Sequence, residues 1–477
     1  MELRKLSINQ VAEAVCHGEI TARRLIEKTL KNCSVLNEGL NIFACISGID
    51  ALEQADAVDR KVANGTSLPL AGVPVAVKDD ICYGVLPTGL GSAAFKEFPS
   101  PYTATALERL MNAGAIIIGK TNLDDMSLGS TTASSPDGPT ANPWDVERTA
   151  GSAGAAAVVT GICMLAIDSD SGGALRQGAS HCGVIGLRPT MGRISRYGLT
   201  TYSSSFGQVG ITAISGENII HALEIVSGFD KRDASTAICK ERLGGKSDFT
   251  KVKGIKIGYP AAIFDYLDSS QRDILDQARE EFATKGFEIV ELELALLPEA
   301  LQAYYVIALA EASSNHSRFD GIRFGTAEDA GDLEELYRKT RSRTFGREAR
   351  RRSIFGTLLL SKGNYDFYYR QALKIWKLVR QEFANTLAKC DLLMLPAVKT
   401  LPRLVTEETD FLQAWEDDLF CAPVSLSGLP SICLPAGQAG KLPVGLQLVG
   451  RPFSEELLAL VGDQVIREIK LFPHGIS

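Results

Sequence analysis

The sequence predicts an α/β protein with a mixed or parallel sheet. Apolar runs typical of strands alternate along the chain with runs that have the periodicity of amphipathic helices. Hydrophobic residues make up 45% of the 477 residues and charged residues 22%, which excludes a disordered or collagenous chain. The length allows about three domains of average size, but large α/β enzymes also fold as one unit. We expect one large domain with a helical insertion.

The first 65 residues predict helices. In residues 6–18, Ser7 precedes an apolar periodic run that ends in a glycine, and these are the start and stop signals of an amphipathic helix. Residues 21–33 have a second helical pattern. We therefore separate an N-terminal helical segment, residues 1–65, from a main domain, residues 66–477.

The main domain begins with alternating strand and helix signals. Short apolar runs predict strands at 70–78, 115–120, 251–260, 390–397, 431–437 and 442–450. The last two are expected to form a hairpin around Gly440. Residues 269–293 are typical of a helix followed by a strand, and 103–114 of a helix. From about 265 to 390 we expect a mainly helical insertion.

Charge and composition narrow the function classes. The formal net charge is −7, which argues against nucleic-acid binding by this chain alone, because such binding needs a basic surface. No apolar run approaches the length of a membrane span, and the first residues lack the apolar core of a secretory leader. The ten cysteines are scattered without a C-x-x-C pair, which favours free thiols in the cytoplasm. The five histidines are isolated, so no helix-borne zinc pair is expected.

Residues 114–121 match the phosphate-loop pattern G-x-x-x-x-G-K-[ST]. That loop needs flexible backbone amides that wrap a phosphate, between a strand and a helix. Here the four middle residues are Ala-Ile-Ile-Ile, which favours a buried strand over a nucleotide site.

Lys78 ends an apolar strand and is followed by Asp79 and Asp80. It is either a strand-end lysine in a salt bridge or a buried lysine that acts as a base.

The stretch 168–176 reads DSDSGGALR. Consecutive small residues let backbone N–H groups converge on one point, as an oxyanion hole requires. The same glycines also suit a tight strand-to-helix turn packed against a neighbour. Glycine density alone does not separate the two interpretations.

Several segments, in order, resemble the amidase signature family. They are GVPVAVKDDI, IIIGKTNLDDMSLGSTT, NPWDVER, DSDSGGALRQGASHCGVIGLRPTMGRISRYGL, AYYVIALAEASSNHSRFDGIRFG, GNYDFYY and LPVGLQLVGRPF. Within that family the chain is most similar to the A subunits of glutamyl-tRNA(Gln) amidotransferases. The resemblance covers roughly residues 5–465 and implies a large mixed central sheet with helices on both faces.

The resemblance implies a Ser–cis-Ser–Lys triad that hydrolyses an amide. In such A subunits the triad frees ammonia from glutamine, or sometimes asparagine. The ammonia serves a partner that activates Glu-tRNA(Gln) with ATP. The family pattern therefore implies amidotransferase B and C subunits as partners, tRNA held only through a partner, and no membrane. It implies no cofactor in this chain, with ATP and Mg²⁺ on a partner subunit.

The family roles carry over to particular residues. Lys78 matches the base, and Ser171, Gly172 and Gly173 match the oxyanion stretch. Arg351 or Arg352, together with Asp418, falls where A subunits hold the carboxylate and amine of glutamine. These residue types suit the task, because a guanidinium binds a carboxylate in a bidentate manner and a carboxylate attracts an ammonium group.

The sequence departs from the family at the catalytic positions. The nucleophile position is Ala174, where the family has serine. The loop before it is about three residues short, so the bridging serine aligns with Ala150 without a gap and with Ser152 with one. Two further positions differ: Ala133 where A subunits usually have Glu, and Gly207 where they usually have Asp.

Loss of the nucleophile predicts absent or strongly impaired hydrolysis, that is, a pseudoenzyme. Two alternatives stay open. One is an active amidase that uses a displaced serine, Ser152 or Ser171. The other is a non-catalytic subunit that binds a small amide or amino acid, or that serves a structural role.

Overall fold

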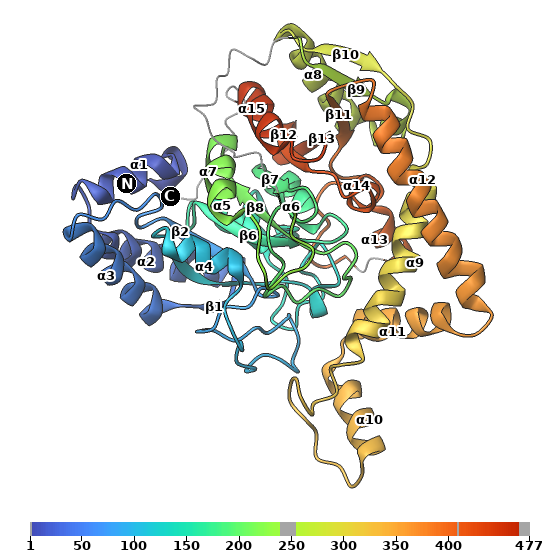
Figure 1. Ribbon diagram of the computed structural model, residues 1–477, viewed down its shortest axis with the longest axis horizontal. Helices are drawn as coiled ribbons and strands as arrows, with labels where there is room; N and C mark the ends of the chain where they lie inside the picture. The colour runs from blue at the N-terminus through green and yellow to red at the C-terminus, as the bar shows by residue number, and fades with distance from the viewer. Residues whose placement is uncertain (1, 239–253, 408–409, 467–477) are drawn as a thin grey trace.

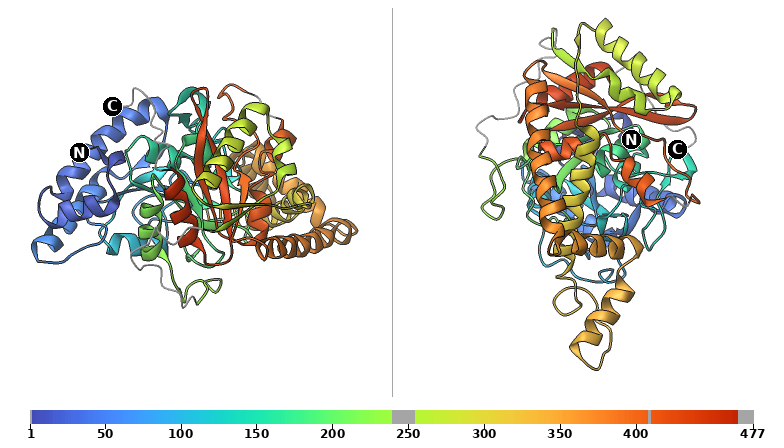
Figure 2. Two further views of the ribbon diagram at one scale, coloured as in Figure 1. Left: turned by 90° about the horizontal axis from the view of Figure 1, so that it is seen from above. Right: turned by 90° about the vertical axis from the view of Figure 1, so that its right-hand side faces the viewer.

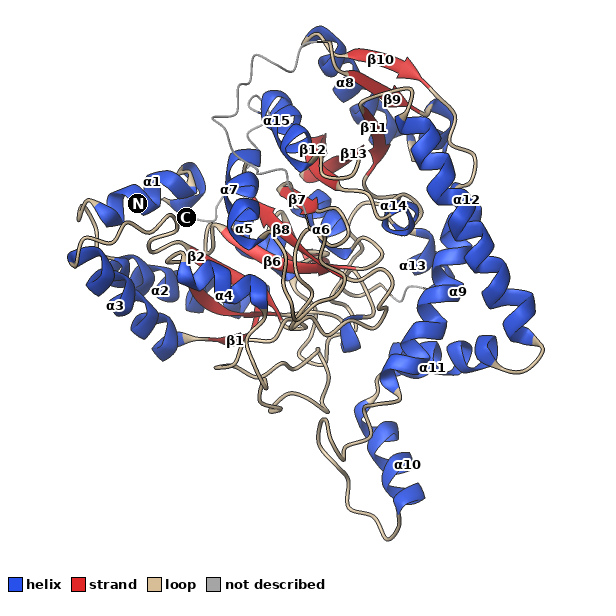
Figure 3. Ribbon diagram, in the orientation of Figure 1, coloured by secondary structure: helices blue, strands red, loops and turns tan. Residues whose placement is uncertain are grey.

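The computed structural model describes residues 2–238, 254–407 and 410–466. Within these residues, eleven strands form one mixed sheet in the order β1-β3-β2-β6-β8-β7-β12-β13-β11-β9-β10 (Figure 3). A separate pair, β4 and β5, forms a small antiparallel ribbon. The strands are β1 (Phe43–Ile46), β2 (Pro74–Lys78), β3 (Ile116–Thr121), β4 (Ala141–Asn142), β5 (Asp145–Thr149), β6 (Leu165–Asp170), β7 (Ile185–Arg188), β8 (Gln208–Ala213), β9 (Lys256–Tyr259), β10 (Glu288–Glu291), β11 (Leu392–Pro396), β12 (Ser431–Ala439) and β13 (Leu442–Gly450).

Helices surround this sheet (Figure 1). They are α1 (Ile8–Cys16), α2 (Ala22–Leu40), α3 (Gly48–Ala63), α4 (Thr105–Asn112), α5 (Ala153–Val159), α6 (Ala174–Cys182), α7 (Gly216–Val226), α8 (Ser269–Thr284), α9 (Leu297–His316), α10 (Leu333–Thr344), α11 (Arg347–Leu360), α12 (Arg370–Leu387), α13 (Phe411–Glu416), α14 (Ala422–Ser427) and α15 (Glu455–Ile466). Short turns of 3-10 helix are η1 (Leu3–Lys5), η2 (Asp125–Ser127) and η4 (Ala261–Tyr266), and η5 (Tyr365–Tyr369) is a π-helical turn.

Both faces of the sheet are buried, as the sequence predicts. Along β2 the side chains of Val75 and Val77 belong to one hydrophobic cluster, and Ala76 between them belongs to the other. Successive side chains of a strand point to opposite faces, so helices must cover each side. This explains why the strand sequence is continuously apolar instead of alternating.

The strands and helices expected for the main domain are present. β2, β9, β11, β13, α4 and α8 lie within the predicted ranges, whereas β3 ends one residue and β12 two residues beyond theirs. Residues 251–253 of the range expected for β9 lie outside the described residues. The hairpin turns at Gly440, whose φ is +62°. The phosphate-loop pattern is the buried strand β3, so the strand interpretation of residues 114–121 is confirmed. The nine cysteines in the described part of the chain are free thiols.

The N-terminal segment is helical, but it also supplies a strand. Ser7 caps α1 in a capping box with Gln10, which explains where the first helix begins. After α2, the unpredicted strand β1 pairs antiparallel with β3 and becomes one edge of the sheet. The domain boundary near residue 65 stays a prediction.

The range 265–390 is mainly helical, with the strand β10 beside β9 at the other edge of the sheet. α9 and α12 lie side by side along one flank, and α10 projects from the body of the molecule (Figures 1 and 2). Across the described ranges, no helix combines the length and apolar character needed to cross a membrane.

The topology brings separate segments to one sheet edge. β2 is parallel to both β3 and β6, with Val77 opposite Lys120 on one side and Ile167 on the other. Parallel neighbours end at the same edge, and ligands of α/β proteins gather there. Lys78, the loop after β3 and the end of β6 therefore meet.

Candidate active site

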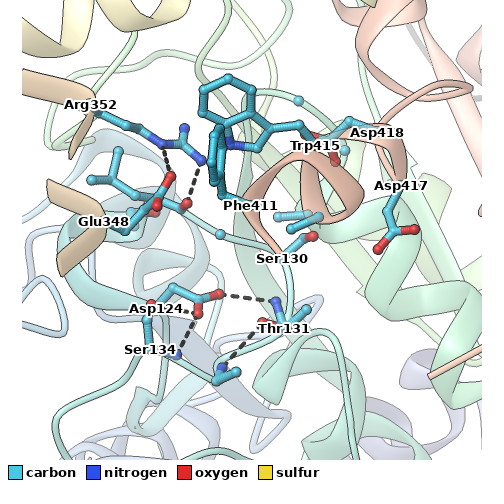
Figure 4. Close-up of a pocket in the computed structure, with 18 of the residues that line it drawn as sticks. Asp124, Ser130, Thr131, Ser134, Glu348, Arg352, Phe411, Trp415, Asp417 and Asp418 are labelled. Carbon is cyan, nitrogen blue, oxygen red and sulfur yellow. Dashed lines mark hydrogen bonds and ion pairs between the residues drawn. The ribbon is translucent and has the colours of Figure 1, made fainter. Parts of the chain in front are cut away.

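A pocket of about 520 Å³ opens at this edge. It is lined by Lys78, the turn after β6, the loop after β3, and residues of α11 and α13. Figure 4 shows Asp124 and Thr131 of the loop below Arg352 of α11 and Trp415 of α13. The lining includes Lys78, Ser171, Gly172, Gly173, Ala174, Arg351, Arg352 and Asp418, so eight of the nine predicted site residues face one cavity. The ninth, Ser152, lies in a smaller cavity behind it.

Lys78 takes part in a hydrogen-bonded chain with Ser169 and Asp80. Its Nζ donates to Oγ of Ser169 at 2.9 Å, and that hydroxyl donates to Oδ2 of Asp80 at 2.5 Å. Nζ lies 3.6 Å from the same carboxylate oxygen, with the lysine side chain 12% exposed. The salt bridge proposed for this lysine is therefore present, inside the pocket and not at a solvated strand end.

Behind Lys78 is a second cavity of about 10 Å³, close to the space of one water molecule. Its lining includes Lys78, Ser152, Asp168, Ser169 and Ala174. Asp168 is 2% exposed and accepts a hydrogen bond from Thr212 at 2.9 Å. Burial raises the pKa of Asp168 to about 6, although the charge of Lys78 and the Thr212 hydroxyl act in the opposite direction.

The two candidates for the bridging serine position differ in placement. Ser152 lines the small cavity, whereas Ala150 is fully buried outside it and donates its N–H to the carbonyl of Thr140. Ser152 is the N-cap of α5, and its Oγ accepts from the N–H of Ala155 at 3.3 Å.

The peptide bonds of the described residues, that of Ser152 included, are trans. Its extended backbone, with φ −130° and ψ 128°, is the ordinary conformation of an N-cap residue.

The turn from β6 into α6 is built from residues that have no room for side chains. A Cβ on Gly172 would lie 2.5 Å from the Tyr304 hydroxyl, and one on Gly173 would lie 2.3 Å from Cβ of Cys421. Gly173 also has φ +134°, which other residues rarely adopt. α6 begins at Ala174, and the first N–H groups of a helix lack partners within it. Close packing and an oxyanion role are therefore both compatible with this turn.

A buried ion cluster fixes the base of the turn. Arg176 donates to both carboxylate oxygens of Asp170 at 3.0 Å, and Arg188 reaches the same group at 3.0 Å. Burial acts to raise the pKa of Asp170, but the two guanidinium charges outweigh it and hold the pKa below its ordinary value. Because both arginines are fully buried, this cluster sets the geometry of the turn and does not contact a ligand.

Arg352 and Arg351 project differently from α11. Arg352 is 5% exposed, binds Glu348 at 2.8 Å and donates to the carbonyl of Leu128 at 2.7 Å (Figure 4). Its guanidinium also lies over the ring of Tyr305, 5.8 Å from the ring centre. Arg351 binds Glu348 at 2.7 Å and stacks on Phe411 nearer the rim.

Asp418 lies across the pocket from these arginines. Its carboxylate accepts from Tyr305 and from Gln177, each at 2.6 Å. Burial raises the pKa of Asp418 to about 6, against the effect of these two hydrogen bonds and of the charge of Arg352. The pocket thus presents a guanidinium and a carboxylate that share Tyr305 as a neighbour.

Sequence reasoning missed the roles of Asp124 and Ser127 in the loop after β3. Asp124 accepts from the backbone N–H groups of Thr131, Thr132 and Ser134, which folds the loop around one carboxylate (Figure 4). Ser127 in this loop donates to Asp80 at 2.7 Å. The signal in the sequence was the acidic pair Asp124–Asp125, which begins three residues after the strand ends at Thr121.

The two other departures from the family pattern have different positions. Ala133 lines the large pocket. Gly207 is not among the lining residues, and a Cβ there would lie 2.1 Å from Oγ1 of Thr201. Close packing therefore accounts for the glycine at 207.

The chain matches known proteins over nearly its full length. The family model Amidase matches residues 24–459. The A subunit of the glutamyl-tRNA(Gln) amidotransferase of Natranaerobius thermophilus is 37% identical, over 100% of this chain and 98% of that protein. The A subunit of the Chromohalobacter salexigens amidotransferase is 39% identical, over 96% of this chain and 95% of that protein.

Solved structures agree with this assignment. The crystal structure of the A subunit of the Thermotoga maritima glutamyl-tRNA(Gln) amidotransferase superposes with a TM-score of 0.81 and 29% identity, over 98% of this chain and 95% of that one. The mixed sheet and its helical layers are thus a shared fold. On these matches, the chain belongs to the amidase family, and A subunits of glutamyl-tRNA(Gln) amidotransferases are among its relatives.

Proposed function

We propose that this chain is the A-type subunit of a cytoplasmic amidotransferase complex, that it binds glutamine or another small amide, and that it has lost most or all hydrolysis. The observation that carries the proposal is Ala174. It begins α6 directly after the Ser171–Gly173 turn and lines the pocket that contains Lys78, Arg352 and Asp418. A methyl group stands where the family attacks the amide carbon.

The binding groups support retention of a ligand. Arg352 takes the α-carboxylate and Asp418 the α-ammonium, which leaves the amide end of the ligand directed at Lys78 and Ala174. The B and C subunits expected from the family would hold the tRNA, ATP and Mg²⁺. This division suits a chain whose net charge is −7.

The experiment is an assay of ammonia release from glutamine by the purified chain, alongside Ala174→Ser and Lys78→Ala. We expect no more than the residual acceleration of about 10³–10⁴ over water that binding and an oxyanion hole provide. Calorimetry on the same samples should detect glutamine binding, with Asp418→Asn as the control that loses it. Release at an enzymatic rate of about 1 s⁻¹ or more that Lys78→Ala abolishes would falsify the proposal.

A second candidate is hydrolysis through a displaced serine. Ser152 is favoured because it lines the small cavity together with Lys78 and Ala174, and Ser171 because it lines the large pocket. The Ser152 hydroxyl already has a structural role, because it caps α5. If ammonia release survives in the parent chain, the double variant Ser152→Ala/Ser171→Ala should abolish it. Unchanged turnover in that variant excludes both serines.

A further inference from the structure

A chain of hydrogen bonds through Ser169 connects Lys78 to Asp80. A serine hydroxyl has one proton, and Ser169 donates that proton to Oδ2 of Asp80 at 2.5 Å. Ser169 therefore accepts from Lys78 at 2.9 Å. Nζ of Lys78 is thus the donor in this contact, and the hydrogen bonds run from the lysine through Ser169 to Asp80.

Asp80 is a buried acceptor of hydrogen bonds. Its side chain is 1% exposed, and Oδ2 accepts from both Ser169 and Ser127, at 2.5 Å and 2.7 Å. Oδ1 has no hydrogen-bond partner among the residues that the structure describes. A buried carboxylate of this kind requires a nearby positive charge, and Nζ of Lys78 at 3.6 Å provides it.

A second carboxylate approaches Lys78 from the adjacent strand. β2 and β6 are parallel with Val77 opposite Ile167, so Lys78 and Asp168 follow at the same level of the sheet. Asp168 is 2% exposed and lines the small cavity together with Lys78. The charge of Lys78 acts to lower the pKa of this carboxyl.

The other charged groups near the lysine are already paired. Asp170 is held by Arg176 and Arg188, and Asp79 by Lys120 at 3.0 Å. Asp124 lines both cavities with Lys78, but its carboxylate accepts from the backbone of its own loop. Asp80 and Asp168 are thus the carboxylates that Lys78 balances.

We propose that Asp80 and Asp168 are positioning residues that hold Lys78 as an ammonium ion, a hydrogen-bond donor for a ligand oxygen instead of a base. The inference deepens the proposed function and rests on it for the ligand. It adds that loss of the serine at position 174 is not the only obstacle to hydrolysis. A serine restored at that position would still lack a base to take its proton. Lys78 then donates a hydrogen bond to the carbonyl oxygen of a small amide and takes no proton from it.

Trace acetylation of the intact protein with acetic anhydride tests the state of Lys78 without reference to turnover. Only an uncharged amine reacts, so the labelling rate from pH 6 to pH 10 reports the lysine directly, and peptide mass spectrometry compares it with the exposed Lys31. Asp80→Asn removes a negative charge that lies 3.6 Å from Nζ of Lys78. The acetylation rate of Lys78 at pH 8 should therefore rise by about tenfold or more. Asp168→Asn should act in the same direction.

Ser127→Ala is the matched control. It removes a hydrogen bond to Asp80 but no charge, so its labelling profile should stay within about twofold of the parent. If Asp80→Asn does not fold by circular dichroism, Asp168→Asn decides the matter alone. Parental labelling profiles in the folded carboxylate variants would overturn the proposal.

A second experiment, an assay of ammonia release, distinguishes failure of this proposal from failure of the proposed function. Ala174→Ser should stay weak in ammonia release, and Ala174→Ser/Asp80→Asn should be faster. Full glutaminase activity in Ala174→Ser alone would show that Lys78 already serves as a base, which overturns the inference and leaves the role of Ala174 intact. If both variants are inactive, the acetylation profile still decides the state of Lys78.

Discussion

The phenol of Tyr305 donates a 2.6 Å hydrogen bond to Oδ2 of Asp418, and the guanidinium of Arg352 lies over the same phenol ring. One aromatic residue thus separates and orients the two charged groups proposed to bind an amino acid. The phenol stabilises the ionised carboxylate, since it donates to the charged form. The pocket is therefore sensitive to pH through Asp418.

Glutamine binding should weaken as the pH falls from 7 to 5. Burial raises the pKa of Asp418 to about 6, and below that pH the carboxyl is neutral and no longer attracts the ligand ammonium. Calorimetric Kd values across this range should rise by about tenfold for each pH unit below the midpoint.

Tyr305→Phe provides the matched test of this pH dependence. Loss of the donated hydrogen bond raises the pKa of Asp418, so the midpoint should move upward. Asp418→Asn should abolish both strong binding and its pH dependence. A Kd that is constant from pH 5 to pH 7 in the parent would contradict the role of Asp418.

Arg352 and Arg351 should differ in their effect on ligand binding. Arg352→Lys keeps the charge but loses the planar fork that binds Glu348 and the Leu128 carbonyl. We expect Kd for glutamine to rise by about tenfold or more, as for loss of a charge-assisted bidentate contact. Arg351→Lys, whose side chain stacks on Phe411, should change Kd by much less. The opposite order would assign the carboxylate to Arg351.

The sequence identified most of the residues that line the pocket, but not how each of them is oriented. Lys78 and the segment 168–176 were singled out separately, and they meet because β2 and β6 are parallel neighbours that end at one edge of the sheet. Arg351 and Arg352 could not be separated, since adjacent helical residues point about 100° apart and the sequence does not show which direction faces the pocket.

The network around Ser169 was missed for a related reason. Hydrogen-bond direction depends on which carboxylate lies nearest, and Asp80 reaches Ser169 only after β2 and β6 are placed side by side. β1 was missed because its four residues are too short for a clear periodic signal. The distinction between Ala150 and Ser152 likewise depended on the three-dimensional course of the loop.

Asp125 should make stability fall as the pH rises toward neutrality. Burial raises its pKa to about 7 from an ordinary value of 3.8, although the Gly346 N–H donates to its carboxylate at 3.0 Å. The folded state then binds the proton more tightly than the unfolded chain. Between about pH 4 and pH 7 this group's contribution to the free energy of unfolding therefore decreases as the pH rises.

Asp125→Asn should remove that part of the pH dependence. Urea unfolding at pH 5.5 and pH 8 should show a smaller difference between the two pH values in the variant than in the parent, by about 1 kcal/mol or more. Asp137→Asn is the control, because Asp137 pairs with Lys96 at the surface. Equal pH dependence in parent and Asp125→Asn would contradict the assignment.

Gly178 and Gly39 should respond in opposite ways to alanine, although both lie inside helices. A Cβ on Gly178 in α6 would lie 2.2 Å from Cβ of Ser152, whereas nothing lies within 4 Å of a Cβ on Gly39 in α2. Alanine lowers the cost of helix formation by about 1 kcal/mol relative to glycine, so Gly39→Ala should stabilise the protein by up to that amount. Gly178→Ala should instead destabilise it by about 1–3 kcal/mol, because α5 and Ser152 must shift. Urea unfolding measures both, and a stabilising Gly178→Ala would show that the α5–α6 contact beside the candidate site is looser than the structure indicates.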